Sequence, residues 1–160
     1  TNHYIDSTNR VLKKSDIALR IRENNDFVLT LKTPLSEGLL EKNQNITWRE
    51  YSDLEDNGIF PQGDIKNFLE ICGFNTRELK VLASLKTSRI ELELDDGVLC
   101  LDENIYGPNN SIIDYELEVE ATSMEKAEET AKKILKEVGI EDFKFNTHSK
   151  QARAISAIKL

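Results

Sequence analysis

The chain has 160 residues, of which 39% are hydrophobic and 31% are charged, and its formal net charge at pH 7 is −8. This composition suits a single globular domain over residues 1–160, and the negative charge argues against a general nucleic-acid binder, which normally has a basic surface. No apolar run approaches the roughly 20 residues that span a bilayer, so we expect no membrane partner. The two cysteines, Cys72 and Cys100, are too few for a disulfide framework, and a reducing cytoplasm is the simplest location.

The first part of the chain predicts strands with one apolar and one basic face. Residues 3–6 predict a short strand, and residues 17–22 alternate cleanly between apolar and other side chains. A second alternating strand at 27–32 follows a polar turn, so the two strands predict a hairpin. Its basic face would carry Arg20, Arg22 and Lys32. Two arginines on a strand are usually only surface residues, and the hairpin alone leaves that interpretation open.

The next part predicts a loop and a helix. We expect a loop at 34–40, followed at 47–51 by a short strand or by the start of a helix. A further helix is expected to begin with Asp64 as its N-cap and to end at Gly73. The apolar stripe of this helix includes Cys72, which we expect to be a small core residue.

A third alternating segment starts at Arg89 and runs to Asp96–Gly97, a strong signal for a two-residue hairpin turn. Counting pairs outward from that turn places Glu93 opposite Cys100 and Glu91 opposite Asp102. One face of this hairpin would then be charged, with Arg89, Glu91, Glu93 and Asp102 on it.

Residues 114–120 alternate strictly between acidic and apolar side chains, which predicts a β-strand with an acidic face. That face carries Asp114, Glu116, Glu118 and Glu120. Neighbouring carboxylates would lie ~6.6 Å apart. At an effective dielectric constant of about 20 each pair would repel by roughly 2.5 kcal/mol. The row is either a solvated sheet face or a divalent-metal site, and the strand alone leaves both interpretations open.

The last part predicts one long helix, capped by Thr122 or Ser123 and ended by Gly139. We expect its apolar stripe to belong to the core; the stripe consists of Met124, Ala127, Ala131, Ile134, Leu135 and Val138. Residues 143–145 predict a last strand.

Several strands therefore pair an apolar face with a strongly charged one. If the sheet closes, the charged faces line its interior, one wall basic and the other acidic. Such a lumen suits a polyphosphate bridged by a divalent metal, because arginine binds phosphate oxygens and carboxylates bind the metal. A water molecule could then attack the bound phosphate in line.

The motifs follow one another in a specific order: Leu19-Arg20-Ile21-Arg22, Leu29-Thr30-Leu31-Lys32, Arg89, Asp102 and Tyr115-Glu116-Leu117-Glu118-Val119-Glu120. In this order they resemble the CYTH family, the triphosphate tunnel metalloenzymes, which include thiamine triphosphatases, inorganic triphosphatases and class IV adenylyl cyclases. The resemblance runs from about Tyr4 to Arg153, and it is strongest to the stand-alone CYTH proteins of Gram-positive bacteria.

The resemblance implies an α+β fold in which an antiparallel eight-stranded β-barrel closes into a tunnel with flanking helices. It implies triphosphate-binding roles for Arg20, Arg22, Lys32, Arg89, Lys150 and, as the acid that follows the tunnel lysine, Glu50. It implies Mg²⁺ or Mn²⁺ ligands at Glu116, Glu118 and Asp102, and a catalytic role for Glu116, Glu118 and Lys150. Glu120 could equally lie at the tunnel mouth, and we expect His148 and Arg153 to be surface residues. The partner would be a small triphosphate or nucleotide, and the protein a monomer or a homodimer.

One departure from the family is the absence of its first strand, Glu-x-Glu-x-Lys, before Tyr4. We expect an N-terminal segment to precede Thr1, because an open barrel would leave an unpaired edge; otherwise the protein lacks part of its metal and phosphate site. Three functions stay open: a metal-dependent triphosphatase, a cyclase that releases pyrophosphate from ATP, and a non-catalytic binder of polyphosphate or nucleotide. We favour the triphosphatase, because nothing in the sequence indicates an adenine-specific pocket.

Overall fold

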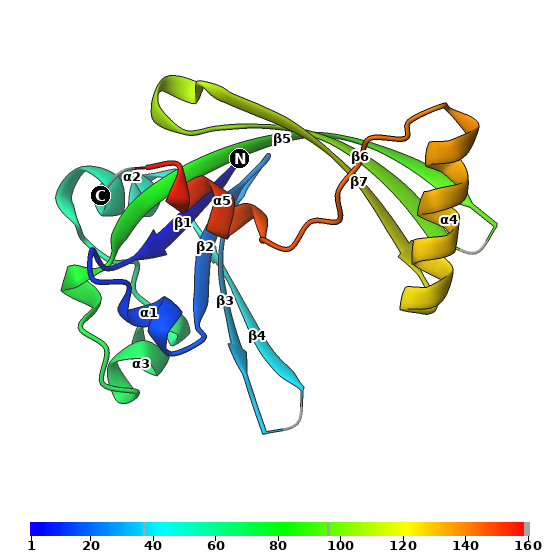
Figure 1. Cartoon of the computed structure of the whole chain (residues 1–160). Helices are drawn as coiled ribbons and strands as arrows, with labels where there is room; N and C mark the ends of the chain where they lie inside the picture. The colour runs from blue at the N-terminus through cyan, green and yellow to red at the C-terminus, as the bar shows by residue number, and fades with distance from the viewer. Residues whose placement is uncertain (37, 96, 159–160) are drawn as a thin grey trace.

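The computed structural model describes residues 1–36, 38–95 and 97–158, which form a strongly curved antiparallel sheet with helices against it (Figure 1). The strands are β1 (Asn2–Asp6), β2 (Ala18–Glu23), β3 (Phe27–Pro34), β4 (Leu39–Ile46), β5 (Lys80–Leu94), β6 (Gly97–Tyr106) and β7 (Ile112–Ala121). The helices are α1 (Val11–Lys14), α2 (Trp48–Asn57), α3 (Asp64–Ile71), α4 (Met124–Glu137) and α5 (Lys150–Ser156), with 3-10 turns at Thr76–Glu78 and Pro108–Asn110.

The strands form one seven-stranded sheet in the order β4-β3-β2-β1-β5-β6-β7. Every neighbouring pair is antiparallel. Within the described residues the sheet is open, with β4 and β7 as its two edges. The expected α+β class and antiparallel pairing are therefore confirmed, whereas the closed eight-stranded barrel is not what these residues form.

The hairpin of β2 and β3 forms as predicted and supplies the centre of the larger core cluster. Leu19, Ile21, Leu29 and Leu31 are fully buried on its apolar face. Side chains from α1, α2 and α3 complete this cluster, and Figure 1 shows these helices gathered at one end of the sheet. Burying each such side chain stabilises the fold by about 1.5–3 kcal/mol, so this end holds the opposite, charged face of the hairpin in place.

Strand β4 was not predicted from the sequence. It covers part of the expected loop at 34–40, and it pairs with β3 from Phe27–Ile46 to Pro34–Leu39. The sequence of β4 is polar on both faces between Leu40 and Ile46, so it lacks the alternation that marks a half-buried strand. At 47–51 the helical alternative is right, because Thr47 is the N-cap of α2.

The helix α3 forms, but two details differ from the prediction. Its N-cap is Gly63, and Asp64 is the first helical residue. Gly73 follows the helix with a φ of 87°, as expected for a C-terminal glycine. Cys72 is exposed, so its assignment to the core is wrong.

The hairpin of β5 and β6 has the predicted faces but a different register. Arg89 lies opposite Asp102, and Glu93 lies opposite Val98 rather than Cys100. The predicted turn includes Asp96, which lies outside the described residues. The faces are still right, because a register error of two residues keeps each side chain on the same side of the sheet.

The C-terminal part differs more from the prediction. Ser123 caps α4, and of its expected core stripe only Leu135 is buried, while Met124 and Val138 are exposed. Residues 143–145 are irregular rather than a strand. In the described residues no helix is long and apolar enough to cross a membrane.

Helix α5 packs on the opposite side of the sheet from α1, α2 and α3. Its buried residues Ala154 and Ile155 belong to a second, smaller cluster with Tyr4, Leu85 and Tyr106. These three strand residues point to the charged face of the sheet, so α5 places its N-terminal residues over that face.

Candidate functional site

The charged face of the sheet and the start of α5 border an open cavity of about 350 Å³. Strand residues from β1, β2, β3 and β7 form most of its wall, and the segment that leads into α5 forms the rest. The lining residues are Asn2, Tyr4, Ala18, Arg20, Thr30, Lys32, Glu116, Glu118, His148, Ser149, Lys150 and Gln151. One wall is therefore basic and the facing wall acidic, as the strand patterns predict.

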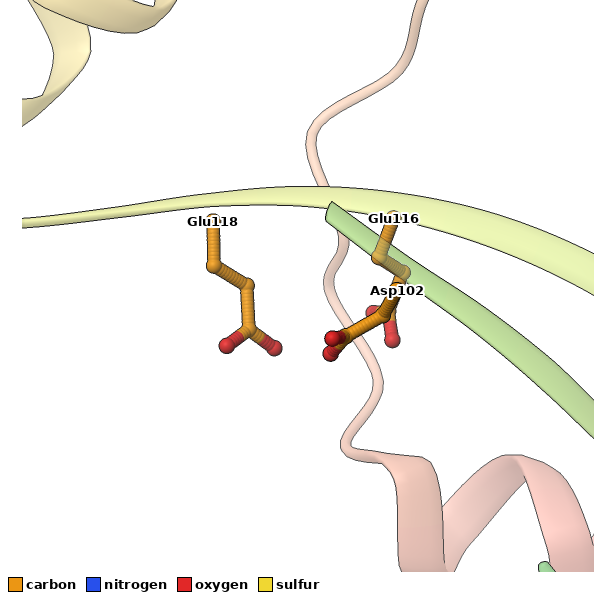
Figure 2. A group of neighbouring side chains, drawn as sticks. All are labelled: Asp102, Glu116 and Glu118. Carbon is orange, nitrogen blue, oxygen red and sulfur yellow. The ribbon is translucent and has the colours of Figure 1, made fainter. Parts of the chain in front are cut away.

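The acidic wall is built around a cluster of three carboxylates, Asp102, Glu116 and Glu118, shown in Figure 2. One oxygen from each lies within 4.8 Å of the others. The register of β6 and β7 explains this, because Asp102 lies directly opposite Glu116, and Glu118 is two residues further along the same face. In Figure 2 all three carboxylates point to the same side of the sheet, toward α5.

Lys150, the first residue of α5, places its ammonium among these three carboxylates. Its Nζ lies 2.5 Å from Asp102 Oδ2, 2.7 Å from Glu118 Oε1 and 3.3 Å from Glu116 Oε2. The contact links the last helix to the sheet across 48 residues of sequence. Among the described residues, Lys150 is the one cation that contacts all three members of the acidic cluster.

Two arginines contact the acidic cluster from its sides. Arg89 donates two hydrogen bonds to the Asp102 carboxylate, both 2.7 Å long, and a third, 2.6 Å long, to Glu118. Arg153 lies 2.8 Å from Glu116 and 3.2 Å from Asp114. The expectation that Arg153 is a surface residue is therefore wrong, because it is half-buried and paired.

The amides of Asn104 and Asn146 also donate hydrogen bonds to Glu116. Burial raises the pKa of the Asp102 carboxyl, but hydrogen bonds from Arg89 and Lys150 outweigh burial and hold this pKa below its ordinary value. For the Lys150 ammonium, burial lowers the pKa, and hydrogen bonds to Asp102 and Glu118 outweigh that effect and raise it. At neutral pH the Asp102 carboxyl is thus ionised and the Lys150 amine is cationic.

The basic wall comes from β2 and β3, and Arg20 and Lys32 both line the cavity. Lys32 forms an ion pair of 2.9 Å with Glu41 on β4. The Nε of Arg20 is buried and has no hydrogen-bond partner among the residues that the structure describes. A buried donor without a partner costs about 1–3 kcal/mol, so an anion that accepts from Arg20 would recover that cost.

Four of the residues predicted for the site, Arg22, Arg89, Glu50 and Asp102, are not among those that line the cavity, although Asp102 belongs to the acidic cluster. Arg22 is exposed on β2, and Arg89 is held by the carboxylates. Glu50 belongs to the capping box of α2, where its carboxylate accepts from the Thr47 backbone N–H and hydroxyl. Glu120 is exposed on the acidic face and lies outside the acidic cluster.

Sequence reasoning missed Asn2, Tyr4 and Thr30 as lining residues. Tyr4 is only 3% exposed, and burial raises the pKa of its hydroxyl. The signal for it was the alternation of β1, in which Asn2 and Tyr4 share one face, but a strand of five residues gave no sign of which face was internal. His148 is exposed, as expected, and it also lines the cavity.

The acidic cluster has the donor set that hard divalent cations prefer, because Mg²⁺ and Mn²⁺ bind carboxylate oxygens. The Lys150 ammonium already lies against one oxygen of each carboxylate, so the arrangement accommodates positive charge at its centre. Asp102, Glu116 and Glu118 can therefore hold a metal ion.

The chain is similar to known proteins in both sequence and fold. The model of the CYTH domain matches residues 1–151. A Bacillus subtilis (strain 168) protein named "Putative triphosphatase YjbK" is 36% identical over 140 residues, which cover 87% of this chain and 70% of that protein. A crystal structure from Bacillus halodurans, described as "a putative adenylate cyclase", has a TM-score of 0.73 and 38% identity and covers 95% of this chain and 79% of that one.

Proposed function

The chain belongs to the CYTH domain family, and from this we propose that it is a divalent-metal-dependent hydrolase that cleaves an inorganic or organic triphosphate in the cavity under α5. One observation carries the proposal: on one side of the cavity the buried Arg20 Nε has no hydrogen-bond partner within the described part of the chain, and on the other side lie the carboxylates of Glu116 and Glu118. A triphosphate that carries a metal ion needs both kinds of wall, since its oxygens take hydrogen bonds from cations and its metal takes carboxylate ligands.

In this proposal Arg20 and Lys32 bind the phosphate oxygens and orient the chain of phosphates along the basic wall. Asp102, Glu116 and Glu118 hold Mg²⁺ or Mn²⁺, which would neutralise phosphate charge and make a bound water more acidic. The Glu118 side chain is 39% exposed, so its carboxylate can accept a hydrogen bond from the attacking water. Lys150 donates to the phosphate oxygens as charge moves onto the leaving group.

The family also supports a finer proposal for the fold. We propose that residues 1–160 are one CYTH domain and that a strand pairing with both β4 and β7 completes an eight-stranded closed barrel. The edge strands β4 and β7 of the described sheet would otherwise leave backbone N–H and C=O groups without partners.

A class IV type adenylyl cyclase is the second candidate, and the description of the Bacillus halodurans structure favours it. A cyclase must also hold an adenine ring. Among the described residues that line the cavity, the one phenyl-type ring is that of Tyr4, which is 3% exposed and offers little surface for stacking. We therefore prefer the triphosphatase, and a non-catalytic polyphosphate binder is the third outcome of the test.

The test is phosphate release from inorganic triphosphate by the full-length protein, in Mg²⁺, in Mn²⁺ and in excess EDTA. Metal-dependent orthophosphate release supports the triphosphatase. Cyclic AMP and pyrophosphate from ATP would show the cyclase instead, and triphosphate binding without any product would show the binder.

The matched variants change one or two carboxylates to amides on the same sheet. Glu116→Gln with Glu118→Gln is expected to abolish metal-dependent release while circular dichroism stays native. Glu93→Gln, an exposed residue on the same face of the sheet, is the control and should retain activity. Full metal-dependent release by the double variant would contradict the assigned metal ligands.

A further inference from the structure

We propose that the Lys150 ammonium occupies the cation position of the acidic cluster until a triphosphate withdraws it, so that metal binding and triphosphate binding are coupled through this one side chain. The inference rests on the proposed function for its ligands. It adds a positioning role for Lys150 that decides when the metal can bind.

The first support is the geometry of the three ion pairs. An ammonium has three hydrogens, and Lys150 directs its contacts to one oxygen on each of the three carboxylates, at 2.5–3.3 Å. A metal ion that used the same oxygens would lie about 2.1 Å from them. The ammonium and the metal ion therefore compete for one position.

The second support is the charge of the surroundings. The three carboxylates of the acidic cluster and the neighbouring Asp114 face three cations, Arg89, Lys150 and Arg153, so the formal charge of this group is −1. A divalent ion added alone would leave this group with a net charge of +1. A triphosphate, which carries several negative charges, removes that imbalance. Metal binding alone is thus disfavoured, and binding together with triphosphate is favoured.

The third support is that Lys150 can reach both ligands. It lines the same cavity as Arg20 and Lys32, and its side chain is 19% exposed. Its flexible four-carbon stem can carry the ammonium from the carboxylates to a phosphate oxygen inside this cavity. Arg89 cannot substitute for it, because both Arg89 donors to Asp102 form a fixed bidentate pair.

The decisive measurement is Mn²⁺ binding in the absence of triphosphate. The electron paramagnetic resonance signal of free Mn²⁺ reports how much of the ion is bound. Lys150→Gln is expected to bind Mn²⁺ at least about tenfold more tightly than the wild type, within the range typical of allosteric coupling. Lys32→Gln is the matched control, because it removes the same charge from the same cavity without contacting the acidic cluster. Lys32→Gln should change Mn²⁺ affinity less than about threefold, since the Lys32 ammonium lies on the basic wall and acts on the acidic cluster only through a screened field.

Two results would overturn the proposal. Lys150→Gln could bind Mn²⁺ no more tightly than the wild type, which would mean that the ammonium does not compete. Lys32→Gln could raise Mn²⁺ affinity as much as Lys150→Gln, which would mean that total cavity charge, not occupancy, controls metal binding.

A second measurement uses the unaltered protein, so it stands even if Lys150→Gln fails to fold. Lysine acylation read by mass spectrometry should increase several-fold at Lys150 when Mn²⁺ is added, because the displaced ammonium loses its carboxylate partners. Labelling of Lys86, an exposed lysine on β5, should stay unchanged. No increase at Lys150 under saturating Mn²⁺ would contradict displacement.

The coupling itself is measured from two affinities: that for triphosphate in EDTA, and that for the Mn²⁺ complex of triphosphate in the presence of Mn²⁺. Because coupling is reciprocal, these two affinities should differ by at least about tenfold in the wild type and by less than about threefold in Lys150→Gln. Equal ratios in both proteins would refute the role of Lys150. None of these readouts requires hydrolysis, so a protein that binds triphosphate without cleaving it would overturn the proposed function and leave this inference intact.

Discussion

Replacing Asp102 with asparagine should test how far the ion network around the acidic cluster supports the fold. The Asp102 side chain is fully buried, and Arg89 and Lys150 donate three hydrogen bonds to its two oxygens. Asparagine keeps the shape, but its amide has one acceptor oxygen and turns an N–H₂ group toward two cations. Arg89 and Lys150 would then lose the partner that stabilises their charges.

The expected magnitude follows from the burial of the partners. Breaking a buried ion pair by removing one member typically costs about 3–5 kcal/mol. The Arg89 and Lys150 side chains are 30% and 19% exposed, so water can solvate them in part, and Glu118 still accepts from both. We therefore expect Asp102→Asn to lower the free energy of unfolding by about 3 kcal/mol, the lower end of this range. In a protein of this size that lowers the melting temperature by roughly 6–12 °C.

The assay is urea unfolding followed by circular dichroism, at pH 7 and in a series toward pH 3. Because the pKa of Asp102 is lowered in the folded state, its stabilisation is present above the unfolded pKa of about 3.9 and is lost as the pH falls through the folded value. The difference in free energy of unfolding between the wild type and Asp102→Asn should therefore shrink below about pH 4. Glu93→Gln, at an exposed position of the same sheet, should change stability by less than about 0.5 kcal/mol. A loss below about 1 kcal/mol in Asp102→Asn at pH 7 would refute the reasoning.

Two further predictions concern ligand contact and thiol reactivity. Arg20→Gln should weaken triphosphate binding in EDTA by about 1.5–3 kcal/mol, because a charge-assisted hydrogen bond is lost, and calorimetry would measure it. Arg22→Ala, at an exposed position two residues along the same strand, should have the smaller effect; the reverse order would show that Arg22 is the phosphate ligand. Cys72 is exposed and Cys100 is buried with a raised thiol pKa, so one thiol should react with Ellman's reagent in the native protein and the second only on unfolding. Rapid reaction of both thiols would contradict the burial of Cys100.

The parts of the fold that sequence reasoning predicted correctly are those with strict alternation. Strands β2, β3 and β7 alternate, and their faces are as expected, since a half-buried strand requires that pattern. Strand β4 is polar on both faces, and its place is decided by pairing with β3 rather than by its own sequence. The register of β5 and β6 depends on a turn whose geometry the sequence does not determine.

The site was predicted in part for the same reason. Arg20, Lys32, Glu116 and Glu118 share the charged face because alternation puts them there. The ion pairs of Lys150 and Arg153 depend on where α5 packs, and that follows from two buried residues, Ala154 and Ile155, against a distant strand. The repulsion estimated for the isolated acidic strand is consequently offset in the folded protein, because cations from elsewhere in the chain lie between the carboxylates.

The uneven distribution of the core gives the molecule two mechanically different halves. The half around β2 and β3 is fastened by a large apolar cluster. The outer parts of β5, β6 and β7 instead leave Ile90, Leu92, Leu101, Ile113 and Tyr115 exposed, and ionic contacts tie their acidic face to α5. Local opening should therefore start in this half, and its amide protons should exchange with solvent first. The acidic wall of the cavity is thus the more flexible of its two walls, and the basic wall is the more rigid.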